Sequence, residues 1–264
     1  MYNTLMFVSV PSLPTDLTAP GVDILAAWSP KAPMSEYGLD PRSVKYNMSS
    51  GSSVACAHAT GVAAYVKSFH PKWSPDAIRS ALMTTASPLN STKNPYGEFA
   101  YRAGQINPLR AVDPGLVYDA DEADYIKMLC AQGYNSDKIK LISGDNSHRP
   151  DVSNITVRDF NYPLMTAFIK DGSPVTIKFS RTVTNVGPAN STYKATVTSK
   201  LKAIKVTVVP TVLSFKSSSE KQDFVVTVVG ELPTDATVSG SLVWSDGKHK
   251  VRSPIFLFTR FTYR

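Results

Sequence analysis

Residues 50–86 read "SGSSVACAHATGVAAYVKSFHPKWSPDAIRSALMTTA" and contain two consecutive helix patterns. Apolar and small residues recur every three to four positions from Val54 onward, which predicts a helix capped by Ser53. A second helix is predicted after Ser74, because serine is a favoured N-cap and Pro75 and Asp76 are favoured in the first turn. Small residues dominate both patterns, so we expect these helices to lie close to a sheet or to each other.

The pattern changes to strands in the second half of the chain. From about residue 160 apolar and polar residues alternate, as in "PVTIKFSRTVTNVG" at 174–187 and "GSLVWSDGKHKVRSPI" at 240–255. Within the latter, Asp246 and Gly247 form a strong hairpin-turn signal. About seven short strands with regular turns predict an all-β sandwich of immunoglobulin or fibronectin type. Residues 133–159, which are rich in Asn, Ser, Asp and Gly, are predicted to be a linker.

Composition and charge argue against several classes of protein. The 264 residues carry a net charge of +7 that is spread along the chain, which argues against a nucleic-acid partner. No apolar run approaches the roughly 18 residues of a membrane span, so no membrane partner is expected. The two cysteines, Cys56 and Cys130, and the four histidines lack the spacing of metal ligands, so no metal and no other cofactor is predicted. A disulfide between the two cysteines stays open.

The start of the chain and its sequons bear on the compartment. Residues 1–16, "MYNTLMFVSVPSLPTD", have a short apolar core without preceding basic residues or a small-residue cleavage site, so no signal peptide is visible. Four N-x-S/T sequons, at Asn47, Asn90, Asn154 and Asn190, would suit a secreted glycoprotein. Asn47 is better explained as part of a strand, which leaves Asn90, Asn154 and Asn190 as glycosylation candidates.

Ser53 has two interpretations. As an ordinary N-cap it would only satisfy backbone N–H groups at the start of a helix, and for an isolated serine this is the commoner role. As a nucleophile it would lie at the positive end of the helix dipole, where unsatisfied N–H groups can stabilise a developing oxyanion. Gly51 would then allow a tight turn and close approach of a substrate.

Several segments together decide between these interpretations. The stretch at 50–86 resembles the catalytic-serine segment of plant, cucumisin-like subtilisin-like serine proteases, whose pattern is S-G-T-S-M-x-x-P-H. Upstream, "DLTAPGVDILAAWSP" at 16–30 resembles the same family. Downstream, so do "GQINPLRAVDPGLVYD", "DFNYP", "RTVTNVG" and "WSDGKHKVRSPI". The resemblance runs from about residue 16 to 256 and identifies the chain as the C-terminal portion of such a protease.

The resemblance implies a domain organisation and a site. It implies an unmatched segment at 1–15, the C-terminal part of an α/β peptidase domain at 16–132, the linker, and a fibronectin type III-like sandwich at 160–264. Ser53 falls on the family's nucleophile, with its backbone N–H in the oxyanion hole, and Gly51 and Ser52 fall on supporting motif positions. Cys130 resembles a position whose cysteine partner is replaced here by "HRP", so it is expected to be a free thiol.

One part of the catalytic machinery is absent from these residues. The family's triad has the order Asp, His, Ser, but no histidine precedes Ser53, and His58 lies five positions later, on a different face of the helix. We therefore expect a serine endopeptidase by family whose chain, taken alone, is inactive. The alternative is a non-catalytic interaction protein whose β-sandwich binds a protein or a cell-wall partner.

The resemblance also implies partners and a location. The complete enzyme would act on a peptide or protein substrate, and the sandwich could support a homodimer. The implied location is extracellular, in the apoplast or cell wall.

Overall fold

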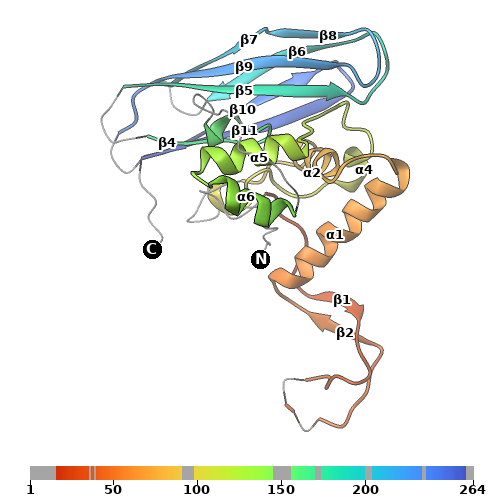
Figure 1. Cartoon of the computed structure of the whole chain (residues 1–264). Coiled ribbons are helices and arrows are strands. Elements are labelled where there is room, and N and C mark those ends of the chain that lie inside the picture. Colours follow the sequence, from red (N-terminus) through yellow and green to blue (C-terminus); the bar gives the residue numbers. More distant parts are fainter. Residues whose placement is uncertain are drawn as a thin grey trace.

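The computed structural model describes residues 16–35, 37–38, 40–90, 98–144, 156–169, 174–199, 204–233 and 236–259. Two sheets form a β-sandwich, and short helices cover one side of it. A long helix with a two-stranded sheet extends away from the sandwich and from the short helices (Figure 1). The first part of the chain holds β1 (Ile24–Ala27), β2 (Tyr46–Ser49), α1 (Ser52–Phe69), α2 (Pro75–Thr84), α3 (Glu98–Tyr101), α4 (Pro108–Ala111), β3 (Leu116–Val117), α5 (Glu122–Ala131) and α6 (Ser136–Ser143). The second part holds η2 (Val157–Asp159), β4 (Met165–Phe168), β5 (Val175–Asn185), β6 (Ser191–Ser199), β7 (Ile204–Val209), β8 (Val212–Phe215), β9 (Lys221–Gly230), β10 (Thr237–Ser245) and β11 (Lys250–Phe258).

The predicted β-sandwich is confirmed. One sheet has the strand order β4-β11-β10-β6-β8 and the other has the order β3-β5-β9-β7. All pairs in these sheets are antiparallel except β11 with β4. The predicted turn at Asp246 and Gly247 joins β10 to β11, whose register places Ser245 opposite Lys250.

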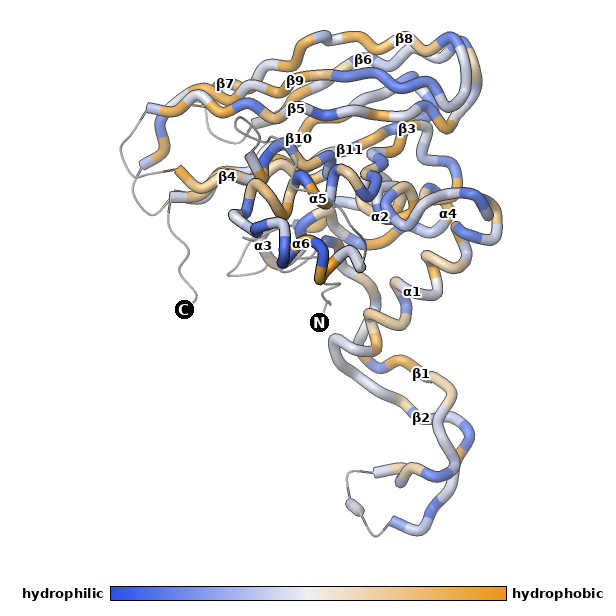
Figure 2. The backbone as a smooth tube through the Cα atoms, in the orientation of Figure 1, coloured by the Kyte–Doolittle hydropathy of each residue, from blue (hydrophilic) through white to orange (hydrophobic). Residues whose placement is uncertain are grey.

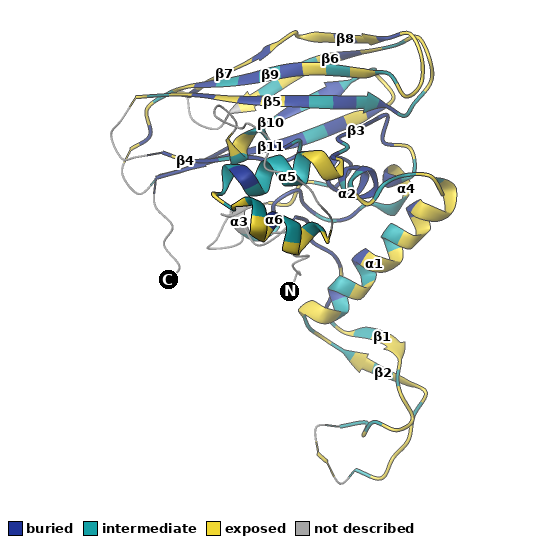
Figure 3. Cartoon of the chain, in the orientation of Figure 1, coloured by how far each residue is buried: buried dark blue, intermediate teal, exposed yellow. Residues whose placement is uncertain are grey.

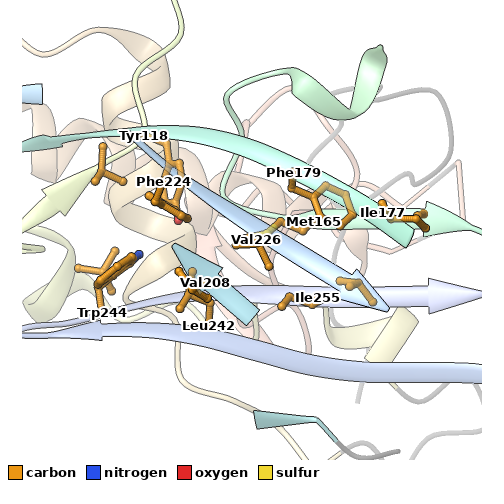
Figure 4. Packing of buried hydrophobic residues seen from close by; sticks show 14 of the residues in the cluster. Tyr118, Met165, Ile177, Phe179, Val208, Phe224, Val226, Leu242, Trp244 and Ile255 are labelled. Carbon is orange, nitrogen blue, oxygen red and sulfur yellow. The ribbon is translucent and has the colours of Figure 1, made fainter. Parts of the chain in front are cut away.

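Alternation along the strands builds the core of the sandwich. In β5, Ile177, Phe179 and Val183 are buried, while intervening side chains such as Lys178 are exposed. Figure 4 shows residues of both sheets meeting between them, with Trp244 close to Phe224. Such interdigitation of two apolar faces is the main stabilising contribution in this architecture.

The helical prediction needs one correction. α1 begins at Ser52 with Gly51 as its N-cap, so Ser53 is the second residue of the helix and does not cap it. Gly51 has a φ of 155°, which favours glycine, and its carbonyl accepts the N–H of Ala55 at 3.3 Å. For α2 the prediction is confirmed, because the Ser74 hydroxyl accepts the N–H of Ala77.

Residues 133–159, expected to be a linker, contain regular structure. α6 runs from Ser136 to Ser143 within them, with the side chain of Asn135 accepting the N–H of Lys138 and Gly144 in the left-handed region. The polar residues that suggested a linker are thus partly the caps of a short helix.

Buried apolar residues join the helical part to the sandwich at two places. β3 pairs with β5, so Leu116 and Tyr118, which precede the predicted sandwich, are buried in its core. On the other side, Phe256 of β11 is buried in the cluster that includes Ile78 and Leu82 of α2. The two parts therefore share their hydrophobic cores. No helix among the described residues is long and apolar enough to cross a bilayer.

Candidate active site

Ser53 lies exposed in the first turn of α1. The first N–H groups of a helix have no intrahelical acceptor, so those of Ser52, Ser53 and Val54 are available to an anion at this end. In the part of the chain that the structure describes, the Ser53 hydroxyl makes no hydrogen bond. The site thus combines an accessible hydroxyl with the positive end of a helix of 18 residues.

The backbone before Ser53 is fixed by neighbouring segments. The N–H of Gly51 donates to the carbonyl of Gly21 at 2.7 Å, and the N–H of Asp23 donates to the Ser50 hydroxyl at 2.8 Å. β1 and β2 pair from Ile24 opposite Ser49 to Ala27 opposite Tyr46, which carries the chain directly into α1. Among the described residues, an added Cβ at Gly51 would meet the Ser53 hydroxyl alone, at 3.9 Å, so the space beside Ser53 is open.

The histidines of the described residues are engaged away from Ser53. The Nε2–H of His70 donates to the carbonyl of Val112 at 2.7 Å, and its ring stacks on Trp73 with ring centroids 3.7 Å apart. His58 lies five residues beyond Ser53 on α1, which places it roughly 140° around the helix axis. His249 lies in the turn between β10 and β11, and His148 lies outside the described residues.

The aspartates that precede Ser53 also have other partners. Asp16 is buried and accepts a hydrogen bond from the hydroxyl of Tyr162, and burial raises the pKa of its carboxyl to about 6. Asp40 pairs with Arg42 and accepts from Ser35, contacts that hold its pKa below the usual range. Asp23, the third of these aspartates, accepts a hydrogen bond from the Ser50 hydroxyl at 3.3 Å.

The remaining predicted residues fall in different places. Ser52 is exposed in the first turn of α1 beside Ser53. Asn90 and Asn190 are exposed, and Asn154 lies outside the described residues. Both Cys130 and Cys56 are free thiols; Cys130 is buried, whereas Cys56 is half-buried.

One polar cluster escaped the sequence analysis. His249 lies between Asp246, at 2.7 Å from Nδ1, and Asp113, at 3.1 Å from Nε2. Lys248 also reaches Asp113, at 2.7 Å, and burial together with Asp246 raises the pKa of Tyr193. Asp113 and His249 are too far apart in the sequence for any spacing rule to pair them. The only local signal was the Asp-Gly turn before Lys248.

The sequence profile of the Subtilase family matches residues 9–133, which include Ser53 and the whole of α1. Residues 9–133 belong to the subtilase family. A second profile, that of a fibronectin type-III domain, matches residues 159–257, the segment that forms most of the sandwich.

Curated relatives agree with this subtilase assignment. The chain is 51% identical over 259 residues to "Subtilisin-like protease SBT4.3" of Arabidopsis thaliana, a match that covers 96% of this chain and 35% of the relative. It is 50% identical to "Subtilisin-like protease SBT4.4" and 48% identical to "Subtilisin-like protease SBT4.13" of the same plant, over 93% and 96% of this chain and 34% and 35% of those relatives. The chain thus spans about a third of the length of the curated relatives it matches.

The subtilase segment exposes apolar surface around Ser53. Only Ala55, Ala59 and Val66 of α1 are buried, and they mark one face of the helix. On the β1–β2 sheet, Leu25 is 69% and Met48 is 61% exposed. Figures 2 and 3 show these apolar and exposed elements extending away from the body of the chain. Apolar side chains of β1 and β2 therefore lie in contact with solvent in this structure.

Proposed function

We propose that Ser53 is the nucleophile of a subtilisin-like serine endopeptidase and that these 264 residues, taken alone, do not cleave peptides. The observation that carries the proposal is the position of Ser53: an exposed hydroxyl in the first turn of α1, within a segment of the subtilase family. The coarser assignment, membership of a family of serine proteases, rests on the family profile and on the relatives.

The proposed chemistry is acyl transfer. Ser53 Oγ attacks the carbonyl carbon of the scissile peptide bond, and its proton passes to a histidine acting as general base. The oxyanion of the tetrahedral intermediate accepts a hydrogen bond from the backbone N–H of Ser53 at the positive end of α1. Collapse transfers the proton to the departing amine and leaves an acyl-enzyme on Oγ, which water then hydrolyses.

Inactivity of the chain alone follows from the missing base. Without a histidine to accept its proton, a serine hydroxyl is a weak nucleophile near neutral pH. His58, His70 and His249 have positions or partners away from Ser53. The aspartate and the histidine of a working triad would therefore have to be supplied from outside these residues.

A chimeric protein tests the assignment of Ser53. The part of "Subtilisin-like protease SBT4.3" that precedes its match to this chain is fused to residues 16–264, and cleavage of a fluorogenic peptide is measured. Ser53→Ala should lower kcat by about 10⁶-fold. Ser68→Ala is the matched control, because Ser68 lies exposed on the same helix and, among the described residues, its hydroxyl donates to the carbonyl of Tyr65 alone.

Each outcome of this experiment decides one half of the proposal. An active chimera in which Ser53→Ala cleaves as fast as the parent would refute Ser53 as nucleophile. In parallel, the 264-residue chain is assayed without the fusion. Cleavage by that chain, lost in Ser53→Ala, would refute its inactivity.

We also propose that the protein is extracellular. Support comes from the plant subtilisin-like relatives and from the exposed sequon residues Asn90 and Asn190. Expression with a secretory leader should yield protein that loses mass on treatment with an N-glycosidase. Replacing both asparagines with Gln should remove at least part of that loss, and an unchanged mass in the parent would contradict glycosylation at these sites.

A further inference from the structure

A cavity lies between the subtilase segment and the β-sandwich, away from Ser53. It has a volume of about 190 Å³ and is bordered by Pro88, Leu89, Tyr101 and Arg102 on one side and by β6, β10 and β11 on the other. Its polar lining includes Arg102, Arg252, Thr198 and Ser241. Arg102 and Arg252 place two guanidinium groups in this lining.

The alternation of side chains along β11 explains why Arg252 lines the cavity. Along β11, Val251, Ile255 and Leu257 face the core of the sandwich, so the alternate residues Arg252 and Phe256 face the helical part. The Nη2 group of Arg252 donates to the carbonyl of Ala103, which lies next to Arg102 in the subtilase segment. Arg252 thereby joins the two parts of the chain.

The guanidinium of Arg252 is incompletely satisfied. Its Nε–H is buried without a hydrogen-bond partner among the described residues, and no carboxylate of those residues forms an ion pair with it. Burial lowers its pKa below the usual value, and no opposing charge restores it. A partly buried cation without an anion is unfavourable, and the buried arginines of folded proteins are usually paired.

The other polar groups of the cavity suit the same kind of ligand. Thr198 and Ser241 lie opposite each other on β6 and β10 with their hydroxyls 2.9 Å apart, so one hydroxyl donates to the other and the second can donate to an anion. Arg102, on the opposite wall, is 5% exposed and lies over the ring of Phe256 at 5.8 Å. Donors from both parts of the chain therefore surround one space.

We propose that this cavity binds a small oxyanion, a carboxylate or a phosphate, through Arg252. The planar guanidinium offers parallel N–H donors that match the oxygens of either group. The volume suits a small anion, since sites for drug-sized ligands occupy about 300–1,000 Å³. The bound anion contacts the subtilase segment and the sandwich together, so its binding stabilises the contact between them. This site is independent of proteolysis.

Ligand titration of the whole chain tests the proposal. Sodium phosphate and sodium acetate are added separately at pH 7, with sodium chloride at equal ionic strength as the reference, and the melting temperature and the heat of binding are recorded. We expect saturable stabilisation by at least one of the two oxyanions beyond the chloride reference. The two titrations distinguish a phosphate from a carboxylate as the preferred ligand.

Two variants test whether the anion binds at Arg252. Arg252→Gln should weaken binding at least about tenfold, because it removes both the charge and the forked donors. Arg110→Gln is the matched control, since it removes one positive charge from an exposed position on α4, and its binding should equal that of the parent. Absence of saturable binding in the parent, or equal binding in Arg252→Gln, would overturn the proposal.

A second measurement does not depend on the folding of a variant. The parent chain is treated with an arginine-specific dicarbonyl reagent, and modified residues are identified by peptide mass spectrometry. Phosphate or acetate should slow the modification of Arg252 and leave Arg110 unaffected. Equal rates at Arg252 with and without both anions would count against the site.

Discussion

His249 Nε2 lies 3.1 Å from a carboxylate oxygen of Asp113, and this contact joins the loop after α4 to the turn between β10 and β11. The His249 side chain is 4% exposed and has Asp246 on its other side. Lys248 adds a second ion pair to Asp113. The turn of the sandwich is thus held against the subtilase segment by a small polar cluster whose members carry opposite charges.

The cluster predicts a loss of stability in acid. The Lys248 ammonium and the His249 ring hold the pKa of Asp113 below its usual value. Burial raises the pKa of Asp246, but hydrogen bonds from His249 lower it by more, so that this pKa too lies below its usual value. A lowered carboxyl pKa contributes stability that is present above about pH 4 and is lost as pH falls through the folded-state value. Urea unfolding from pH 7 to 3 should therefore show a smaller acid loss in Asp113→Asn than in the parent. An identical pH profile would contradict the prediction.

Gly115 should not tolerate a side chain. Its φ is 82°, and a Cβ there would lie 2.5 Å from the hydroxyl of Tyr193 and 2.8 Å from Cβ of His249. Gly115→Ala should lower the free energy of unfolding by about 2 kcal/mol or more. The control is Gly61→Ala on α1, where no atom lies within 4 Å and alanine should stabilise the helix by up to about 1 kcal/mol. Equal effects of the two changes in urea titrations would refute the crowding.

Ionised Asp16 should lower the free energy of unfolding at neutral pH. Burial raises the pKa of its carboxyl to about 6, so the folded state favours the protonated form. The cost of ionisation is absent well below pH 4 and grows as pH rises to the folded-state pKa. Asp16→Asn should therefore stabilise the chain by roughly 2 kcal/mol at pH 8 and by little at pH 3.5. If Asp16→Asn instead destabilised the chain by a similar amount at both pH values, the hydrogen bond from Tyr162 would contribute more than ionisation of the buried carboxyl costs.

Trp244 should stabilise the fold through the packing of its ring and not through its indole N–H. It is fully buried, packs edge to face on Phe224 at a centroid distance of 5.2 Å, and its indole N–H has no hydrogen-bond partner among the described residues. Trp244→Ala should cost about 3–5 kcal/mol. Trp244→Phe keeps the aromatic contact and removes the unpaired donor, so its cost should be much smaller. Chemical unfolding of both variants measures the difference, and comparable losses would contradict it.

Much of the architecture could be predicted from local sequence patterns. The two-residue alternation in 174–187 is the direct consequence of a strand with one buried face, and the caps of α2 follow from Ser74 and Pro75. The start of α1 was placed at Val54 because serine is a common cap. The structure starts it at Ser52, since Gly51, without a side-chain cap, already supplies the first helical carbonyl.

Contacts distant in the sequence could not be predicted. Asp113 with His249, and Arg252 with Ala103, depend on how the sandwich lies on the helices, and no periodicity encodes that arrangement. Ser53 was found through a resemblance carried by many segments, because a serine before a helix is by itself uninformative. The polar composition of 133–159 suggested a linker, since helix caps and linkers use the same residues.

The strand β3 affects how the sandwich could be exchanged between proteins. Its residues Leu116 and Val117 pair with β5 and, with Tyr118, lie more than 40 residues before the segment that matches the fibronectin type-III profile. A recombination event that transferred only residues 159–257 would leave that edge of β5 without its neighbour and the core without two of its side chains. The segment that must be transferred to keep the sandwich intact is therefore longer than the residues that match the fibronectin type-III profile, and it would have to include the loop that begins at Asp113.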